Sequence, residues 1–347
     1  MIPLIRAGDR SKQVADVQAR LRALGMSVED EPAVFGETTA AAVRAFQQRR
    51  GLIADGIVGR NTWTELVEAG WRLGDRILYF KHPPLRGDDV MTLQAHLNAL
   101  GFDAGREDGI FGRDTDIAVR AFQREYGVAG DGIVGPHTTR SLTGLRINRP
   151  MTAAALREEL RRSAQAGVRG ALIVVDPGHG GADRGECGCE GTWEADICWD
   201  LARRLADRLS SAGARVRFTR TEAEGPDDSE RAGRANVLGG QIFLSIHLNA
   251  HSEPTAEGSS SFYWRTSKAG AALADLMQQE LAELGQRDCR SHPSSYAILR
   301  ETKMTAVLVE PSYITNPDDE KRLLDIDFRS AIAGRLAQSI RRYFEDN

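Results

Sequence analysis

Two histidines and a carboxylate stand at the ends of short apolar runs in the second half of the chain. His179 follows the run 171–175, His247 comes directly after the run 241–246, and Glu310 closes the run 306–310. Short runs rich in β-branched residues are typical of strands that are buried on both faces. Two imidazoles with one carboxylate form a common catalytic zinc set, which leaves the fourth tetrahedral position for water. These residue types therefore indicate metal-assisted hydrolysis.

A second carboxylate is needed beside such a water, because its proton must be taken up and passed to the leaving group. Glu194 opens a long helical segment 15 residues after His179 and is well placed to complete the metal set. Glu310 is then left for the acid/base role. We therefore predict His179, Glu194 and His247 as metal ligands and Glu310 as the catalytic residue, with no organic cofactor.

Each of these residues also has a simpler explanation when it is taken alone. A histidine after a strand is more often a hydrogen-bonded structural residue than a ligand. Glu194 could be a carboxylate favoured by the dipole at a helix N-terminus, and Glu310 could be a salt-bridge partner. The joint appearance of all four residues, each beside an expected strand end or helix start, favours the metal site.

The elements that must position these residues alternate between strand and helix. We expect strands at 171–175, 215–219, 241–246, 259–264 and 306–310, and helices at 194–212, 229–238, 268–284 and 328–344. This alternation predicts an α/β domain with a mostly parallel central sheet flanked by helices. Ligands of such sheets collect at the carboxyl ends of the strands, so the four side chains should meet along one edge.

The first half of the chain contains an internal repeat with an offset of 76 residues. The segment Ala42–Gln47 recurs unchanged as Ala118–Gln123, and Asp55–Gly59 recurs as Asp131–Gly135. Apolar residues recur at three- and four-residue steps, which predicts three short helices in each copy. Thr38 or Thr39 is the expected N-cap of the second helix. The fold class is therefore multidomain, with two small all-α modules ahead of the α/β domain.

Composition narrows the function classes. With 45 Lys and Arg against 49 Asp and Glu, the net charge of -4 provides no field that would gather nucleic acid or an anionic membrane. No stretch approaches the roughly 18 apolar residues of a membrane span. The first ten residues lack a secretory apolar region, so we expect a cytoplasmic protein by default. The four cysteines are expected to be free thiols.

The expected domain boundaries follow from the repeat and the change in pattern. They are a first module at 1–70, a connector at 71–86, a second module at 87–144, a linker at 145–170 with a helix-like stretch at 152–166, and the catalytic domain at 171–347.

Two family resemblances follow from the motifs. The repeat, with its Leu-Gln, Phe-Gly, Ala-Val-x-x-Phe-Gln and Asp-Gly-Ile-Val-Gly marks, resembles the peptidoglycan-binding module of wall hydrolases. Residues 173–344 resemble the zinc N-acetylmuramoyl-L-alanine amidases, whose marks are DPGHGG, a Glu that opens the next helix, S-x-H-x-N-A, and L-V-E followed by I-T-N.

The amidase resemblance implies one Zn²⁺ per chain, held by His179, Glu194 and His247, with Glu310 as the catalytic carboxylate. It implies cleavage of the amide bond between the lactyl group of N-acetylmuramic acid and L-alanine, in peptidoglycan or a muramoyl-peptide. The chain departs from the family at Ser312, where a glycine is usual, at Tyr313, where phenylalanine is usual, and at Thr305, where proline is common. The missing glycine could alter how closely the substrate backbone approaches Glu310.

The domain order resembles that of a group of actinobacterial proteins, some of which work as cytoplasmic regulators of wall-precursor synthesis. This resemblance implies a rival function, a non-enzymatic regulator or scaffold with an amidase fold that binds a precursor or a protein partner. Such a regulator would be expected to lose at least one of the four site residues. All four are present, which favours a cell-wall hydrolase, an autolysin in the broad sense. An enzyme without an export signal would reach the wall by lysis or by non-classical release.

Overall fold

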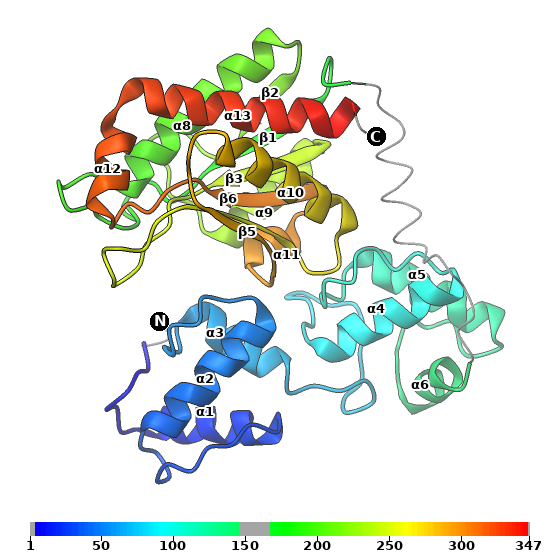
Figure 1. Cartoon of the computed structure of the whole chain (residues 1–347). Coiled ribbons are helices and arrows are strands. Elements are labelled where there is room, and N and C mark those ends of the chain that lie inside the picture. Colours follow the sequence, from blue (N-terminus) through cyan, green and yellow to red (C-terminus); the bar gives the residue numbers. More distant parts are fainter. Residues whose placement is uncertain (1–3, 146–166, 346–347) are drawn as a thin grey trace. The chain divides into compact units, whose positions relative to one another are not determined.

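The computed structural model describes residues 4–145 and 167–345, which divide into two compact units. The first unit is helical and contains the two copies of the repeat (Figure 1). The first copy has α1 (Lys12–Ala23), α2 (Glu37–Arg50) and α3 (Arg60–Glu68), and the second has α4 (Asp88–Leu100), α5 (Arg113–Glu125) and α6 (Pro136–Thr143). The expected three helices per copy are confirmed. The expected helix-like stretch at 152–166 lies outside the described residues.

Each copy has its own apolar core. Leu21, Val43 and Phe46 lie in the first core, and Leu97 and Phe122 lie among the residues of the second. The second core also contains Leu78, whose backbone pairs with Val134 as that of Ile5 pairs with Val58 in the first copy. Part of the expected connector therefore packs into the second copy.

A buried glutamine ties a helix to the loop and the helix that follow it, and this arrangement occurs twice in each copy. Gln47 of α2 donates to the Ile57 carbonyl and the Thr62 hydroxyl, and it accepts from the Gly56 amide. Gln123 repeats this arrangement in α5 with Ile133, Thr138 and Gly132. A buried amide whose donors and acceptor are all used stabilises one loop geometry, because any other geometry leaves polar groups unpaired.

The same arrangement also joins the first and second helices of each copy. Gln94 donates to the Ile110 carbonyl and the Thr115 hydroxyl and accepts from the Gly109 amide, while Gln18 accepts from the Ala33 amide. Each copy is therefore built from two similar halves. The loop residue whose amide donates to the glutamine has a positive φ in all four cases, and Ala33, at 65°, is the one that is not glycine.

The expected N-cap of α2 is wrong. The helix begins after Gly36, which has no capping side chain, and the carboxylate of Asp30 accepts from the amides of Thr38 and Thr39 instead. Burial raises the pKa of Asp30, but these hydrogen bonds lower it by more and hold it at about 2. A residue from the preceding loop can replace a local cap because the loop folds back over the first turn.

Six strands form one sheet in the second unit. They are β1 (Leu172–Pro177), β2 (Arg215–Phe218), β3 (Ile242–Ile246), β4 (Ser259–Trp264), β5 (Asp288–Ser294) and β6 (Thr305–Glu310). Their order is β2-β1-β3-β6-β4-β5, and every pair is parallel except β4 with β6. The predicted α/β domain with a mostly parallel sheet is confirmed.

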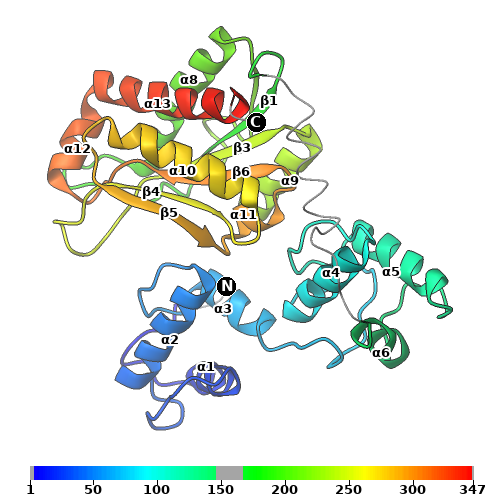
Figure 2. The ribbon, with the colours of Figure 1, turned by 45° about the vertical axis from the view of Figure 1, so that its right-hand side comes forward.

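Helices cover both faces of the sheet. On one face α8 (Glu194–Ser211), α10 (Lys268–Ala282) and α13 (Ile326–Glu345) pack side by side, and on the other α9 (Asp228–Leu238) packs with α11 (Ala297–Glu301) (Figure 2). Strand residues alternate between the two faces, so that Ile173 and Val175 join the core beneath α8 and α13. None of the helices within the described residues is long and apolar enough to cross a membrane.

Three elements were not predicted, and two of them lack a strong local pattern. Strand β5 reads Asp-Cys-Arg-Ser-His-Pro-Ser and has no apolar run, since it lies at the edge of the sheet and gains its order from backbone pairing with β4. Helix α11 has five residues. Helix α12 (Pro317–Leu324) does carry a readable signal, because Asn316 caps it and Pro317 occupies its first turn.

We predict that Ala33→Gly stabilises the first helical copy by about 1 kcal/mol, because an L-residue with a Cβ is strained at a φ of 65°. Amide hydrogen exchange in α1 and α2 should slow by about five-fold, with no change in α4 and α5. The reverse change, Gly109→Ala, is the matched control and should destabilise the second copy, where a Cβ would also lie 3.0 Å from the Gly87 oxygen. Faster exchange in α1 and α2 of the Ala33→Gly variant would contradict this.

Candidate metal centre

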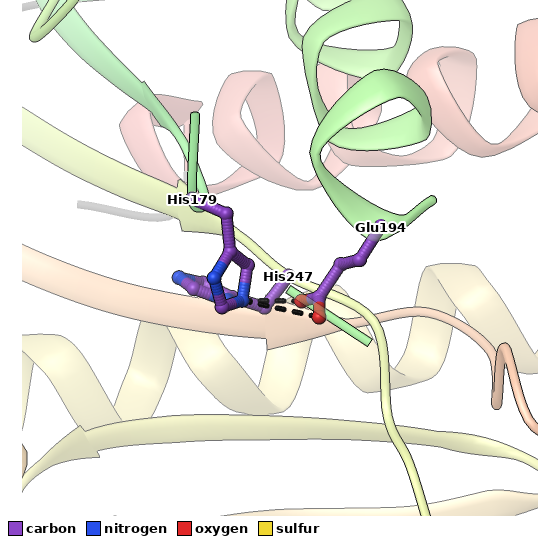
Figure 3. A group of neighbouring side chains, drawn as sticks. All are labelled: His179, Glu194 and His247. Carbon is purple, nitrogen blue, oxygen red and sulfur yellow. Dashed lines mark hydrogen bonds and ion pairs between the residues drawn. The ribbon is translucent and has the colours of Figure 1, made fainter. Parts of the chain in front are cut away.

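The structure brings His179, Glu194 and His247 together (Figure 3). Nε2 of His179 lies 3.1 Å from one carboxylate oxygen of Glu194, and Nδ1 of His247 lies 3.1 Å from the other. The two imidazole rings have centroids 4.9 Å apart and point toward the same carboxylate. These three side chains come from the loop after β1, the first residue of α8 and the residue after β3.

The sheet register explains this convergence. Pro177 at the end of β1 pairs with Ile246 at the end of β3, so the residues that follow leave the sheet at the same edge. The backbone amide of His247 also donates to the Val309 carbonyl of β6, at 3.0 Å. Parallel neighbours thus deliver both histidines to one place.

The carboxylate of Glu194 is held in a fixed orientation. One oxygen accepts from the Leu248 amide at 2.9 Å, and the other accepts from the Glu186 amide at 3.1 Å. Each oxygen therefore faces one backbone donor and one imidazole. The Glu186 amide belongs to the exposed loop that also carries Cys187 and Cys189, whose thiols are free and lie outside the group formed by His179, Glu194 and His247.

Two glycines leave room for this packing. A Cβ at Gly178 would lie 2.6 Å from the His247 ring, and a Cβ at Gly185 would lie 2.6 Å from both Glu194 and His179. Such distances are far inside van der Waals contact, so a side chain at either position would displace one of the three site residues. The glycines of the DPGHGG segment and the loop that follows are required by close approach.

Electrostatics couple the three groups. Burial lowers the pKa of His179, but its hydrogen bonds to Glu194 and Asp183 outweigh this and raise it to about 9. Burial likewise lowers the pKa of His247, and Glu194 again raises it. Burial raises the pKa of Glu194, but the two histidines hold it well below its usual range. The buried carboxylate therefore stays ionised and attracts positive charge.

The donor set fits a zinc ion. Two imidazole nitrogens and a carboxylate oxygen lie within 4.8 Å of one another. Ligand bonds of about 2.0 Å in a tetrahedron place the donor atoms about 3.3 Å apart. This is close to the 3.1 Å between each oxygen of Glu194 and the histidine nitrogen that it faces. Nδ1 of His179 is engaged by the Asp183 carboxylate at 3.0 Å, which leaves Nε2 directed at the site.

Glu310 is the last residue of β6, and its neighbour Val309 pairs with Ile246. Burial raises the pKa of Glu310 to about 7, and the charge of Glu194 adds to this while that of His247 opposes it. A carboxyl group with a pKa near neutrality can both accept and deliver a proton. The environment is therefore suited to the acid/base role that the sequence predicts.

Sequence reasoning missed the residues that support these side chains. Asp183, four residues after His179, orients the imidazole, and its spacing on the same loop was an available signal. Asp176 and Arg231 form an ion pair buried behind the loop, 3.0 Å apart. No local pattern pairs these two, since they are distant in sequence and meet only when α9 packs on the sheet.

Comparison with known proteins covers both halves of the chain. Residues 173–342 match the family described as N-acetylmuramoyl-L-alanine amidase, and residues 10–66 and 86–142 each match a peptidoglycan-binding domain family. The amidase CwlM of Mycobacterium tuberculosis is 42% identical over 362 residues, which cover 98% of this chain and 89% of that protein. The chain belongs to the N-acetylmuramoyl-L-alanine amidase family.

Two other relatives match between 52% and 57% of this chain. The amidase LytC of Bacillus subtilis is 30% identical over 200 residues, which cover 57% of this chain and 39% of that protein. The crystal structure of an N-acetylmuramoyl-L-alanine amidase from Clostridium difficile 630 matches with a TM-score of 0.50 and 28% identity, over 52% of this chain and 99% of that one. The amidase fold therefore accounts for the second unit.

The departure from the family's usual glycine at Ser312 has a structural explanation. Ser312 is fully buried, and its φ lies outside the positive range that favours glycine. Gln286 donates to its hydroxyl and to the Pro311 carbonyl, and Arg322 in turn donates to Gln286. The buried hydroxyl of Ser312 therefore has a hydrogen-bond partner within the domain.

We predict that the α/β domain of the cation-free amidase loses stability as the pH rises from 6.5 to about 9. Because His179 has a raised pKa when folded, the folded state holds a proton that the unfolded state has released in this window. The stabilisation that this proton provides is complete below pH 6.5 and is lost as the pH passes 9. Between these values the free energy of unfolding falls with a slope that approaches about 1.4 kcal/mol per pH unit. Urea unfolding after chelation would measure it.

The His179→Gln variant is the control, because it removes the titrating group and keeps a polar side chain of similar length. Its stability should change less steeply with pH over the same window. Equal slopes for the variant and the wild type would show that His179 does not carry the effect.

Proposed function

We propose that this amidase-family chain is a zinc-dependent hydrolase that cleaves the amide bond between the lactyl group of N-acetylmuramic acid and the L-alanine of the stem peptide. The observation that carries the proposal is the convergence of His179, Glu194 and His247 at one edge of the sheet, where Glu310 also ends its strand. The family match over the same residues gives the substrate class.

His179, Glu194 and His247 would hold the metal, one ion per chain. When bound, zinc polarises the scissile carbonyl and lowers the pKa of a water molecule, which supplies the nucleophile. The protein keeps both histidines fixed on their carboxylate partners, so that little reorganisation is needed during the reaction.

Glu310 would take the proton from the attacking water and pass it to the nitrogen of L-alanine as the bond breaks. Transfer in both directions requires a pKa near the working pH, and burial places the pKa of Glu310 at about 7. The leaving stem peptide then carries a free amine, and the glycan keeps the lactyl carboxylate.

The two helical copies would hold the chain on peptidoglycan. Their match to the peptidoglycan-binding domain family supports this role. Because the glutamine-centred networks fix each copy from within, the exposed residues of its helices are free to serve binding.

We predict that Glu310→Gln lowers cleavage of a muramoyl-peptide by about 10²–10⁴-fold, since it removes the proton acceptor but keeps the shape of the side chain. Zinc content should remain about one ion per chain in both proteins. Cleavage is measured by chromatography of the released peptide, and zinc by atomic emission.

Glu283→Gln, at the exposed end of α10, is the matched control and should retain full activity. Equal activity of Glu310→Gln and the wild type would remove Glu310 from the acid/base role. A zinc-loaded wild type without cleavage would instead favour a non-enzymatic regulator with an amidase fold.

We predict that His247→Ala loses most of the bound zinc, because it removes one of three protein ligands and leaves the buried Glu194 with one imidazole partner. Zinc affinity is measured by competition with a chromophoric chelator. The matched control is His292→Ala on β5, whose ring bonds to the Cys289 carbonyl and lies outside the ligand group. Equal zinc affinity of His247→Ala and the wild type would contradict the assignment.

A further inference from the structure

The loop that carries His179 has an unusual backbone. His179 itself has a φ of 55°, and Gly180 and Gly181 have φ values of 125° and 59°. A histidine in the left-handed region is strained, and such a residue persists only where its surroundings hold it. The neighbours that hold His179 therefore help to decide where its imidazole lies.

Arg231 of α9 holds this loop through its backbone. Its guanidinium is buried, with an exposed fraction of 3%. Nη2 donates to the carbonyl of His179, Nη1 donates to the carbonyl of Pro177 at 2.7 Å, and Nε donates to the carbonyl of Pro226 at 2.8 Å. A planar group with fixed donor directions can span three carbonyls in this way.

Asp176 fixes Arg231 in turn and connects it to β3. Its carboxylate is fully buried, lies 3.0 Å from Nη1 of Arg231, and accepts from the Ser245 hydroxyl at 2.7 Å and from the Thr219 hydroxyl. Ser245 stands two residues before His247. The ion pair therefore joins the backbone of one histidine ligand to the strand that carries the other.

Arg220 provides an internal comparison. It donates to the carbonyls of Pro177 and Gly178 on the same loop, but its other bonds go to Thr221 and Glu222. Arg231 thus donates a hydrogen bond to the carbonyl of His179 itself, whereas Arg220 donates to the carbonyls of the two residues before it.

We propose that Arg231, anchored by Asp176, is a positioning residue that holds His179 in its left-handed conformation and thereby sets the affinity of the centre for a divalent cation. The inference rests on the zinc site of the proposed function. If the His179 carbonyl is released, the backbone can relax toward an ordinary φ, and Nε2 then moves away from the position it shares with Glu194 and His247.

Arg231→Lys tests this inference in the full chain. Lysine keeps a positive charge opposite Asp176, but one ammonium group cannot span the three carbonyls. Zinc affinity, measured by competition with a chromophoric chelator, should fall by about 10–100-fold, as is typical for the loss of groups that orient metal ligands. The visible spectrum of the cobalt-substituted protein should also change, because it reports the ligand geometry.

Two controls separate positioning from general stability. Arg234→Lys alters the next arginine of α9, which is partly exposed and pairs with Glu224 and Glu230, and it should keep wild-type affinity. Leu336→Ala removes a buried side chain of α13 and destabilises the fold at a distance. It should leave the cobalt spectrum of the folded protein unchanged.

A wild type that binds no zinc would contradict the proposed function itself. A wild type and an Arg231→Lys variant with equal affinity and identical cobalt spectra would overturn the inference alone. If Arg231→Lys does not fold, the double variant Asp176→Asn with Arg231→Gln replaces the ion pair by neutral amides. Weakened zinc binding in that folded variant supports the inference, and wild-type affinity overturns it.

Discussion

The carboxyl ends of β1, β3 and β6 lie side by side, and the proposed site exists because of this adjacency. Parallel pairing in register delivers His179, His247 and Glu310 to one edge, although they come from three separate segments of the chain. Glu194 completes the group because α8 starts directly above the same edge and two backbone amides orient its carboxylate. Any change that shifts the register of one strand by a residue would turn its site residue away from the other three.

Charge balance adds a second constraint at this edge. A buried carboxylate such as that of Glu194 is costly unless hydrogen-bond donors or positive charge face it, and His179 and His247 hold its pKa well below its usual range. The same arrangement would suit the divalent cation that we propose for this site. Glu310 experiences the opposite environment, since burial favours its neutral form. Two carboxyl groups at one site thereby have different environments, which suits the different roles proposed for them.

The helical copies obtain their order in a different way. Each half-copy has one buried glutamine that satisfies a loop amide and a loop carbonyl, and in three of the four halves a glycine of positive φ allows the loop to reach it. This explains why the repeat retains Gln, Gly and Thr at matching positions while the surface between them differs. Two small cores can therefore persist as separate units within one helical half.

The sequence by itself determined the three-helix copies, the alternating strands and helices, and the four candidate site residues, because periodicity and strand-end motifs are local signals. The tertiary structure decided what depends on distant partners. The edge strand β5 is ordered by pairing with β4, and the cap of α2 comes from Asp30. The anchoring of His179 by Asp183, Asp176 and Arg231 likewise became visible only in the folded chain, since burial and hydrogen bonds between remote residues leave no pattern along the sequence.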